Sequence, residues 1–222
     1  MQTTGQQLVS FLEANGVDRV FCVPGESFLP LLDALGASKI DTITARHESS
    51  AGFMALADGR LSGRPGVFMV SRGPGATNAS IAVHSAQQDG TPLILMIGQG
   101  ERQHVGRDSF QEIDYSKMFG SIAKWVYEIN DPTRVPEVMA RAFSVAMSGT
   151  PGPVVISLPE DILPIELPDV KARASVVANS APTPQAMQQV LELLAKAERP
   201  LLLAGGDFAT DEQRAALRAA AE

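Results

Sequence analysis

The chain lacks several features that would point to particular classes of protein. It has one cysteine, Cys22, so no internal disulfide can form, which fits a reducing compartment. The N-terminus has no basic stretch followed by an apolar core, so it does not read as a signal peptide. Apolar runs such as residues 92–97 are far too short to span a bilayer. These absences predict a cytoplasmic protein with no membrane partner.

Positive charge is scarce and is not gathered into one segment. The formal net charge is -7 at pH 7, and the 18 Lys and Arg residues are scattered along the chain. A nucleic-acid partner is therefore not expected. The histidines, His47, His84 and His104, show no metal-ligand spacing with one another or with Cys22. We expect no metal site formed by this chain.

Short apolar segments alternate with segments of helical periodicity. The apolar segments are rich in Val, Ile and Phe, and most lack polar alternation, which is typical of strands buried on both faces. Repeated strand–helix alternation predicts an α/β fold, with a doubly wound, mostly parallel sheet and helices on both faces. The expected strands are residues 20–23, 42–44, 67–70, 93–97, 121–126 and 154–157, and the expected helices are residues 4–15, 28–35, 48–62, 76–87 and 135–147.

The composition changes after Pro159. Residues 166–183 are rich in Pro, Ala and Ser without sustained periodicity, which predicts a linker after a first domain of residues 1–165. Residues 184–222 follow as an incomplete start of a central α/β domain, with a helix over 184–197, a strand over 200–204 and a helix from Thr210. One strand cannot bury a core of its own. We therefore expect a truncated chain; the alternative is a natural short protein whose last unit packs on the first domain.

Several expected strands run into turns that would meet at one edge of a parallel sheet. These turns are residues 24–27, 71–75 and 98–100, and a fourth strand end leads through residues 45–47 into Glu48. Ligands bind outside the carboxyl ends of the strands in such sheets, and glycine in a turn lets a ligand approach the backbone. We expect the functional site at this edge.

The turn over residues 73–78 nearly matches the dinucleotide-binding fingerprint. Asn78 stands in place of the third glycine, and no acidic residue follows at about 20 positions to hold a ribose. A phosphate-binding lysine loop is absent as well. Spacing alone favours a structural turn, and a dinucleotide-binding domain is rejected.

Glu48 opens an expected helix and has two interpretations. An acid in the first turn offsets the helix dipole, which is worth about 0.3–1 kcal/mol. A carboxyl group followed by small residues at a strand-end cleft would instead be partly desolvated and suited to proton exchange with a heteroaromatic nitrogen. Taken alone, the residue favours the first interpretation.

Six motifs in order nevertheless resemble the acetolactate synthase-like family of thiamine-diphosphate enzymes, over about residues 5–163. Each motif by itself would be weak, and their shared order carries the resemblance. The motifs are residues 16–21 leading to Pro24-Gly25; Arg46-His47-Glu48; Ala57-Asp58-Gly59 with residues 63–67; residues 73–78; Asp108 with Phe110-Gln111-Glu112; and residues 152–154 with Leu158-Pro159.

The resemblance implies that residues 1–165 bind the aminopyrimidine ring of thiamine diphosphate. In such enzymes a glutamate hydrogen-bonds the ring nitrogen opposite the exocyclic amine, and this promotes the tautomer that removes the C2 proton. By motif position that glutamate is Glu48. The implied activity is carboligation or decarboxylation of a 2-oxo acid or aldehyde, by a transferase or lyase. Motif positions place Pro24, Gly25, Ser71, Pro74 and Asn78 around the cofactor, and Glu26, Phe110 and Gln111 near the substrate.

The resemblance also implies parts that this sequence does not contain. Family members hold the diphosphate through Mg2+ on a separate domain, and its Gly-Asp-Gly…Asn signature is absent from the 222 residues. The implied full-length protein is a homodimer or homotetramer, because two subunits form each site, and this chain alone is expected to be inactive. Whether a flavin binds stays open. The alternative function is a non-catalytic domain that serves as a subunit or partner-binding module of a split enzyme.

Two residues depart from the family pattern at the expected ligand edge. Glu26 stands where a second glycine is usual, and Arg72 stands where a serine is usual. An isolated carboxylate there would repel an anionic 2-oxo acid, so we predict that Glu26 and Arg72 pair. The alternative is two separately solvated charges. In either case, specificity for pyruvate does not follow from the resemblance.

Overall fold

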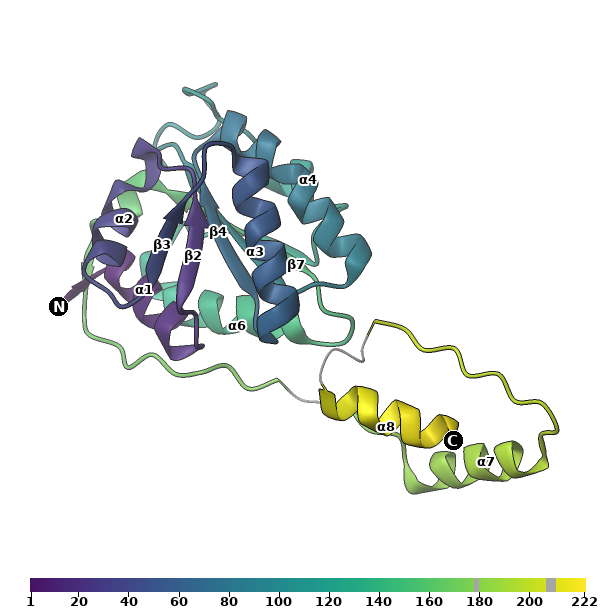
Figure 1. Cartoon of the computed structure of the whole chain (residues 1–222). Helices are drawn as coiled ribbons and strands as arrows, with labels where there is room; N and C mark the ends of the chain where they lie inside the picture. The colour runs from purple at the N-terminus through teal and green to yellow at the C-terminus, as the bar shows by residue number, and fades with distance from the viewer. Residues whose placement is uncertain (178–179, 207–210) are drawn as a thin grey trace. The chain divides into compact units, whose positions relative to one another are not determined.

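The computed structural model describes residues 1–177, 180–206 and 211–222, and the chain forms two compact units, Met1–Val177 and Ala178–Glu222 (Figure 1). The first unit contains a six-stranded sheet in the order β3-β2-β4-β5-β7-β6. All of its neighbouring strands are parallel. The strands are β2 (Arg19–Cys22), β3 (Asp41–Thr44), β4 (Gly66–Val70), β5 (Leu93–Gln99), β6 (Trp125–Glu128) and β7 (Pro153–Pro159).

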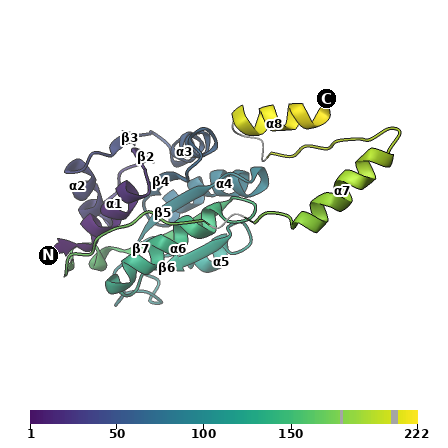
Figure 2. The same cartoon turned by 90° about the horizontal axis from the view of Figure 1, so that it is seen from below.

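Helices cover both faces of this sheet, which confirms the predicted α/β fold (Figure 2). Side chains of α1, α2 and α6 pack on one face, and those of α3, α4 and α5 pack on the other. The helices are α1 (Thr4–Ala14), α2 (Leu29–Gly36), α3 (Glu48–Ser62), α4 (Gly73–Asp89), α5 (Tyr115–Phe119) and α6 (Val135–Met147).

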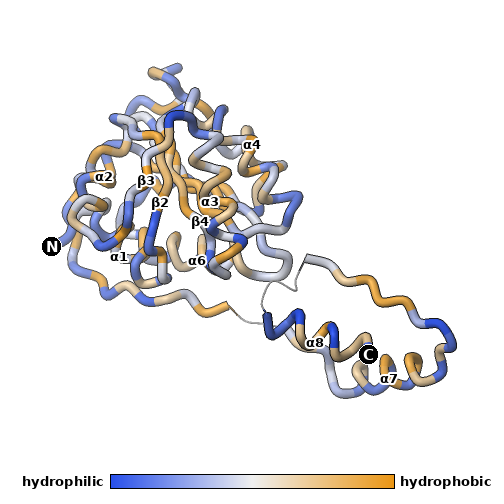
Figure 3. The backbone as a smooth tube through the Cα atoms, in the orientation of Figure 1, coloured by the Kyte–Doolittle hydropathy of each residue, from blue (hydrophilic) through white to orange (hydrophobic). Residues whose placement is uncertain are grey.

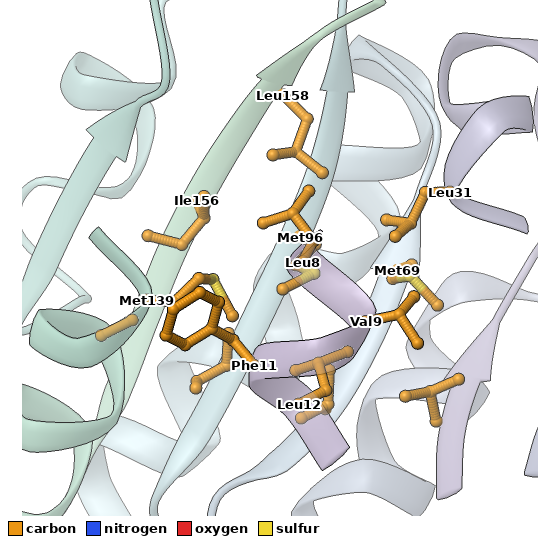
Figure 4. Close-up of a cluster of buried hydrophobic side chains, with 14 of the residues drawn as sticks. Leu8, Val9, Phe11, Leu12, Leu31, Met69, Met96, Met139, Ile156 and Leu158 are labelled. Atoms are coloured by element: carbon orange, nitrogen blue, oxygen red, sulfur yellow. The ribbon is translucent and has the colours of Figure 1, made fainter. Parts of the chain in front are cut away.

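Alternation along each strand sends side chains to two separate cores. In β4, Val67 and Met69 belong to the core under α1, whereas Phe68 and Val70 belong to the core under α3 and α4. Figure 4 shows part of the first core, where Leu8 and Phe11 of α1 lie beside side chains of the central strands. The central strands are correspondingly apolar along the backbone tube of Figure 3. The fold therefore leaves the strand ends, and not the faces of the sheet, for a ligand.

Glycines let α3 lie close to the sheet and to α4. A Cβ at Gly66 of β4 would overlap the backbone of Ala55, and a Cβ at Gly52 would overlap the side chain of Ala82. The helix ends at Gly63, whose φ of 72° is the left-handed conformation that glycine accommodates without strain. This packing fixes the start of α3, and so the backbone of Glu48, at the carboxyl edge of the sheet.

Some expected elements differ from those observed. The strand expected at 121–126 is β6, Trp125–Glu128, because pairing with β7 begins at Trp125 opposite Val154. The short helix α5 and the antiparallel pair of β1 (Gln2–Thr3) with β8 (Glu166–Leu167) were not expected from the sequence. All four residues of the edge strand β3 are exposed, unlike the other members of the sheet.

Residues 166–177 lie along the first unit, although we expected them to belong to a linker. β8 pairs with β1, and the backbone N–H of Ser175 donates to Asn15 Oδ1 at 2.8 Å. The expected limits of the linker and of a central domain stay predictions.

The second unit contains α7 (Pro184–Lys196) and α8 (Asp211–Ala221). The expected helix over 184–197 is therefore present. The expected strand over 200–204 was wrong, since these residues form no strand and are exposed. Thr210, the expected start of the last helix, lies outside the described residues. None of the described helices is long and apolar enough to cross a membrane.

Candidate functional site

The turns after β2, β4 and β5 meet at the carboxyl edge of the sheet, as the sequence predicts. Ser27 Oγ lies 3.1 Å from Ser71 Oγ, which joins the turn after β2 to the turn after β4. A Cβ at Gly25 would come within 2.6 Å of Ser71 Cβ, and a Cβ at Gly98 would overlap Ser27 Oγ. Glycine at these two positions is therefore required for the turns to approach one another.

Glu48 is the first residue of α3 and lies half-buried at this edge. The helix is capped by His47, whose Nδ1 accepts a hydrogen bond from the backbone N–H of Ser49 at 3.2 Å. Asn78 of α4 donates from Nδ2 to Glu48 Oε2 at 2.9 Å. This bond fixes the plane of the carboxylate and leaves Oε1 without a hydrogen-bond donor among the described residues.

The free oxygen of Glu48 faces the first turn of α4. A Cβ at Gly75 would lie 3.5 Å from Glu48 Oε1, so glycine leaves this oxygen uncovered on that side. A carboxyl oxygen held in this way can accept or donate one further hydrogen bond to a ligand at the strand edge. The binding role expected of Glu48 stays a prediction.

The other expected cofactor-binding residues lie on turns at the same edge and form no hydrogen bond with Glu48. Pro24 precedes Gly25 in the turn after β2, and Pro74 lies in the first turn of α4; both are exposed. Ser71 is the single residue between the end of β4 and Arg72. Their role around a cofactor stays a prediction.

Arg72 pairs with Glu26, which confirms the predicted ion pair. Arg72 Nη1 donates to Glu26 Oε1 at 2.6 Å, although the Arg72 side chain is 7% exposed and that of Glu26 is 61% exposed. The pKa of Glu26 lies below its ordinary value, first because its own backbone N–H donates to the carboxylate and also because Arg72 does so. Glu26 is therefore ionised at neutral pH.

Arg72 also contacts a second carboxylate that the sequence analysis missed. Its Nη2 donates to Glu160 Oε2 at 2.5 Å, and Glu160 follows β7 directly. Applying the strand-end argument to the strand at 154–157 would have pointed to Glu160. Arg72 Nε is buried and has no partner among the described residues.

The expected substrate residues Phe110 and Gln111 lie on the loop of residues 101–114 at the same edge. The Phe110 ring is 71% exposed, with its centroid 5.9 Å from Arg72 Cζ. Gln111 has a φ of 59°, and its carbonyl oxygen accepts from the backbone N–H of Gly73 at 3.0 Å. A Cβ at Gly73 would come within 2.8 Å of this carbonyl oxygen, so the glycine lets the loop rest on the start of α4.

A carboxylate inside the loop, Glu112, holds its backbone together. Glu112 accepts from the backbone N–H of Gly106 at 2.6 Å and from the N–H and Oγ of Ser109 at 2.9 and 2.8 Å. The bond from Gly106 is the first cause that holds the pKa of Glu112 below its ordinary value, followed by those from Ser109. Glu112 belongs to one of the family motifs, but its role in the loop was not predicted from the sequence.

The described residues contain no group of three or more His, Cys, Asp or Glu side chains arranged to hold a metal ion. Cys22, a residue of β2, is buried as a free thiol, and burial raises its pKa.

Comparison with known proteins places the chain among thiamine enzymes. The family described as "Thiamine pyrophosphate enzyme, N-terminal TPP binding domain" matches residues 2–118. Acetolactate synthase isozyme 1 large subunit of Escherichia coli is 39% identical over 207 residues, which cover 92% of this chain and 37% of the relative. The probable acetolactate synthase large subunit of Methanococcus aeolicus is 35% identical, covering 90% of this chain and 35% of the relative.

Acetolactate synthase of Mycobacterium bovis is 35% identical over 233 residues, covering 100% of this chain and 37% of the relative. The chain thus spans little more than a third of the length of these relatives.

Proposed function

Because the chain belongs to the thiamine pyrophosphate enzymes and carries their acetolactate synthase-like N-terminal domain, we propose that Glu48 activates bound thiamine diphosphate. The observation that carries this proposal is the Glu48 carboxylate, which Asn78 fixes through one oxygen while the other oxygen stays free beside Gly75. The strand edge around it offers the turns on which a planar ring could rest.

The residues of this chain would act on the pyrimidine ring as follows. Glu48 Oε1 holds a proton between the carboxyl group and a ring nitrogen, because no described protein group competes for that oxygen. Asn78 keeps the carboxylate in the orientation that this bond needs. Gly25, Pro24 and Ser71 would contribute from turns at the same edge, with Pro74 at the start of α4. When bound, thiamine diphosphate supplies a carbon nucleophile for attack on a carbonyl substrate.

We propose that the substrate is a 2-oxo acid or aldehyde and that Glu26, Phe110 and Gln111 face it. The exposed side chains of Glu26 and Phe110 lie on the two segments that meet at Arg72. The reaction class is transferase or lyase chemistry, namely carboligation or decarboxylation.

The diphosphate would be held through Mg2+ by a part of the protein other than the described residues, which provide no cluster for a metal ion. We propose that a second subunit contributes to the site, in a homodimer or homotetramer. A cytoplasmic location agrees with a buried thiol at Cys22.

The test is the substitution Glu48→Gln in the full-length protein. General acid–base catalysis by a positioned side chain contributes about 10²–10⁴-fold, so we expect C2 proton exchange of bound thiamine diphosphate to slow by at least about 10²-fold. Exchange is allowed to proceed in deuterated buffer, quenched after set times and measured by NMR. Glu13→Gln, at the opposite edge of the sheet, is the control and should leave exchange unchanged.

Near-normal exchange in the Glu48→Gln protein would remove Glu48 from the mechanism. If the unsubstituted full-length protein itself shows no accelerated exchange, the alternative of a non-catalytic partner-binding module gains support.

A further inference from the structure

Arg72 connects the ends of three strands through charged side chains. Glu26 follows β2, Arg72 follows β4 and Glu160 follows β7, and both carboxylates accept hydrogen bonds from the guanidinium. Two carboxylates and one guanidinium give this triad a net charge of −1. The triad is therefore not a free positive site, although it contains a buried arginine.

The guanidinium of Arg72 is largely closed to a ligand, because its side chain is only 7% exposed. Nη1 donates one hydrogen bond to Glu26 and Nη2 donates one to Glu160, while Nε is buried and has no partner within the described part of the chain. What faces outward is the exposed carboxylate of Glu26 and the exposed ring of Phe110. A ligand at this edge would meet an acceptor with negative charge and an apolar surface before it could meet the arginine.

We propose that Glu26 is a specificity-determining residue that occupies Arg72 and thereby excludes 2-oxo acids that carry a second carboxylate. This inference rests on the proposed function, because it takes Glu26 and Phe110 as walls of the substrate site. A substrate with one carboxylate and an apolar tail can place the tail against Phe110. A second carboxylate would lie near Glu26 and Glu160 while the guanidinium of Arg72 stays buried, and like charges repel one another.

Removal of the Glu26 charge should weaken or reverse the preference for 2-oxo acids with one carboxylate. In Glu26→Gln, Arg72 is balanced by Glu160 alone, so the net charge of the remaining ionic pair is zero. In Glu26→Gly, Nη1 of Arg72 is also released and can donate to a substrate carboxylate, and Arg–carboxylate bonds are among the stronger hydrogen bonds in proteins. The order of preference for a dicarboxylic acid should therefore be Glu26→Gly, then Glu26→Gln, then the unsubstituted protein.

The experiment compares 2-oxovalerate with 2-oxoglutarate, which have equal chain lengths and differ by a terminal methyl or carboxylate group. Binding to the full-length protein, loaded with Mg2+ and a thiamine diphosphate analogue blocked at C2, is measured by ligand-observed NMR titration. We expect the unsubstituted protein to bind 2-oxovalerate at least about tenfold more tightly, which corresponds to about 1.4 kcal/mol. In Glu26→Gln the ratio should fall to within about threefold, and in Glu26→Gly it should favour 2-oxoglutarate.

Glu101→Gln is the matched control, because it removes one negative charge after β5 without touching Arg72. It should leave the ratio unchanged. The inference is overturned if the unsubstituted protein binds 2-oxoglutarate as tightly as 2-oxovalerate, or if neither Glu26 variant alters the ratio. If neither acid binds, both the inference and the 2-oxo acid substrate are wrong. Normal C2 proton exchange with the natural cofactor would show in that case that the role of Glu48 still stands.

Discussion

At the scale of single residues, Gly75 leaves Glu48 accessible because glycine has no side chain to cover it. A Cβ there would lie in ordinary contact, 3.4 Å from Val70 Cβ and 3.5 Å from Glu48 Oε1. Gly75→Ala should therefore change the free energy of unfolding by less than about 1 kcal/mol. The added methyl group should nevertheless cover one side of the free oxygen of Glu48, so we expect slower C2 proton exchange in the full-length protein, measured by NMR.

Gly36→Ala is the control for this substitution, because Gly36 ends α2 and a Cβ there meets nothing within 4 Å. It should preserve both stability and exchange. Unchanged exchange in Gly75→Ala would show that the ring does not approach Glu48 from the side of α4.

The sequence predicted the Glu26–Arg72 pair because both residues depart from a family pattern at turns that share one edge. It did not predict the bond between Asn78 and Glu48 Oε2, because hydrogen-bond partners depend on how two helices pack. Glu160 was missed because the strand-end argument was not applied to the expected strand at 154–157. It is 88 residues from Arg72 in the chain, and only the placement of β7 beyond β5 brings it near.

At the scale of elements, Glu112 holds the loop that carries Phe110 and Gln111. Its carboxylate accepts hydrogen bonds from two backbone N–H groups and one hydroxyl. Glu112→Gln should therefore weaken the hydrogen bonding of this loop without affecting the sheet. We expect lower hydrogen-exchange protection at Gly106 and Ser109, and unchanged protection in β5.

The same contacts predict a pH dependence. The pKa of Glu112 in the folded chain lies below its ordinary value of 4.5, so the stabilisation is present above that value and is lost as the pH falls through the folded pKa. Protection factors at Gly106 and Ser109 should fall in acid for the natural chain and stay flat for Glu112→Gln. Equal acid sensitivity in both proteins would contradict this role of Glu112.

Helices and strands were predicted well where the burial of apolar side chains determines their limits. They were predicted poorly where hydrogen-bond pairing between strands determines them. The apolar segments of β4 and β5 and the periodicity of α3 and α6 correspond closely to the observed elements. β6 was shifted because the expected strand began at Ser121 and included the apolar Ile122 and Ala123, yet pairing with β7 starts only at Trp125. Residues 200–204 have strand-like composition, but a strand needs a hydrogen-bonded neighbour, and none of the described residues pairs with them.

At the scale of the whole molecule, all buried hydrophobic side chains among the described residues belong to the first unit. Its buried hydrophobic side chains run from Leu8 to Leu167, and they form two clusters on the two faces of the sheet. The described residues of the second unit include no buried side chain, and Leu193, Leu201 and Leu203 are exposed. Since burial of apolar surface is the dominant favourable contribution to folding, the stability of this chain should come from Met1–Val177.

A chain of residues 1–177 should therefore fold as the chain of 222 residues does. We expect its midpoint of thermal unfolding to lie within about 3 °C of that of the longer chain, which for a domain of this size corresponds to less than about 1 kcal/mol. Circular dichroism follows the transition, and amide NMR spectra of the two chains should overlay for residues distant from position 177. A matched chain of residues 1–163 would lose β8 and the hydrogen bond from Ser175 to Asn15, and it should unfold at a lower temperature. Loss of cooperative unfolding in the 1–177 chain would show instead that residues 178–222 stabilise the first unit.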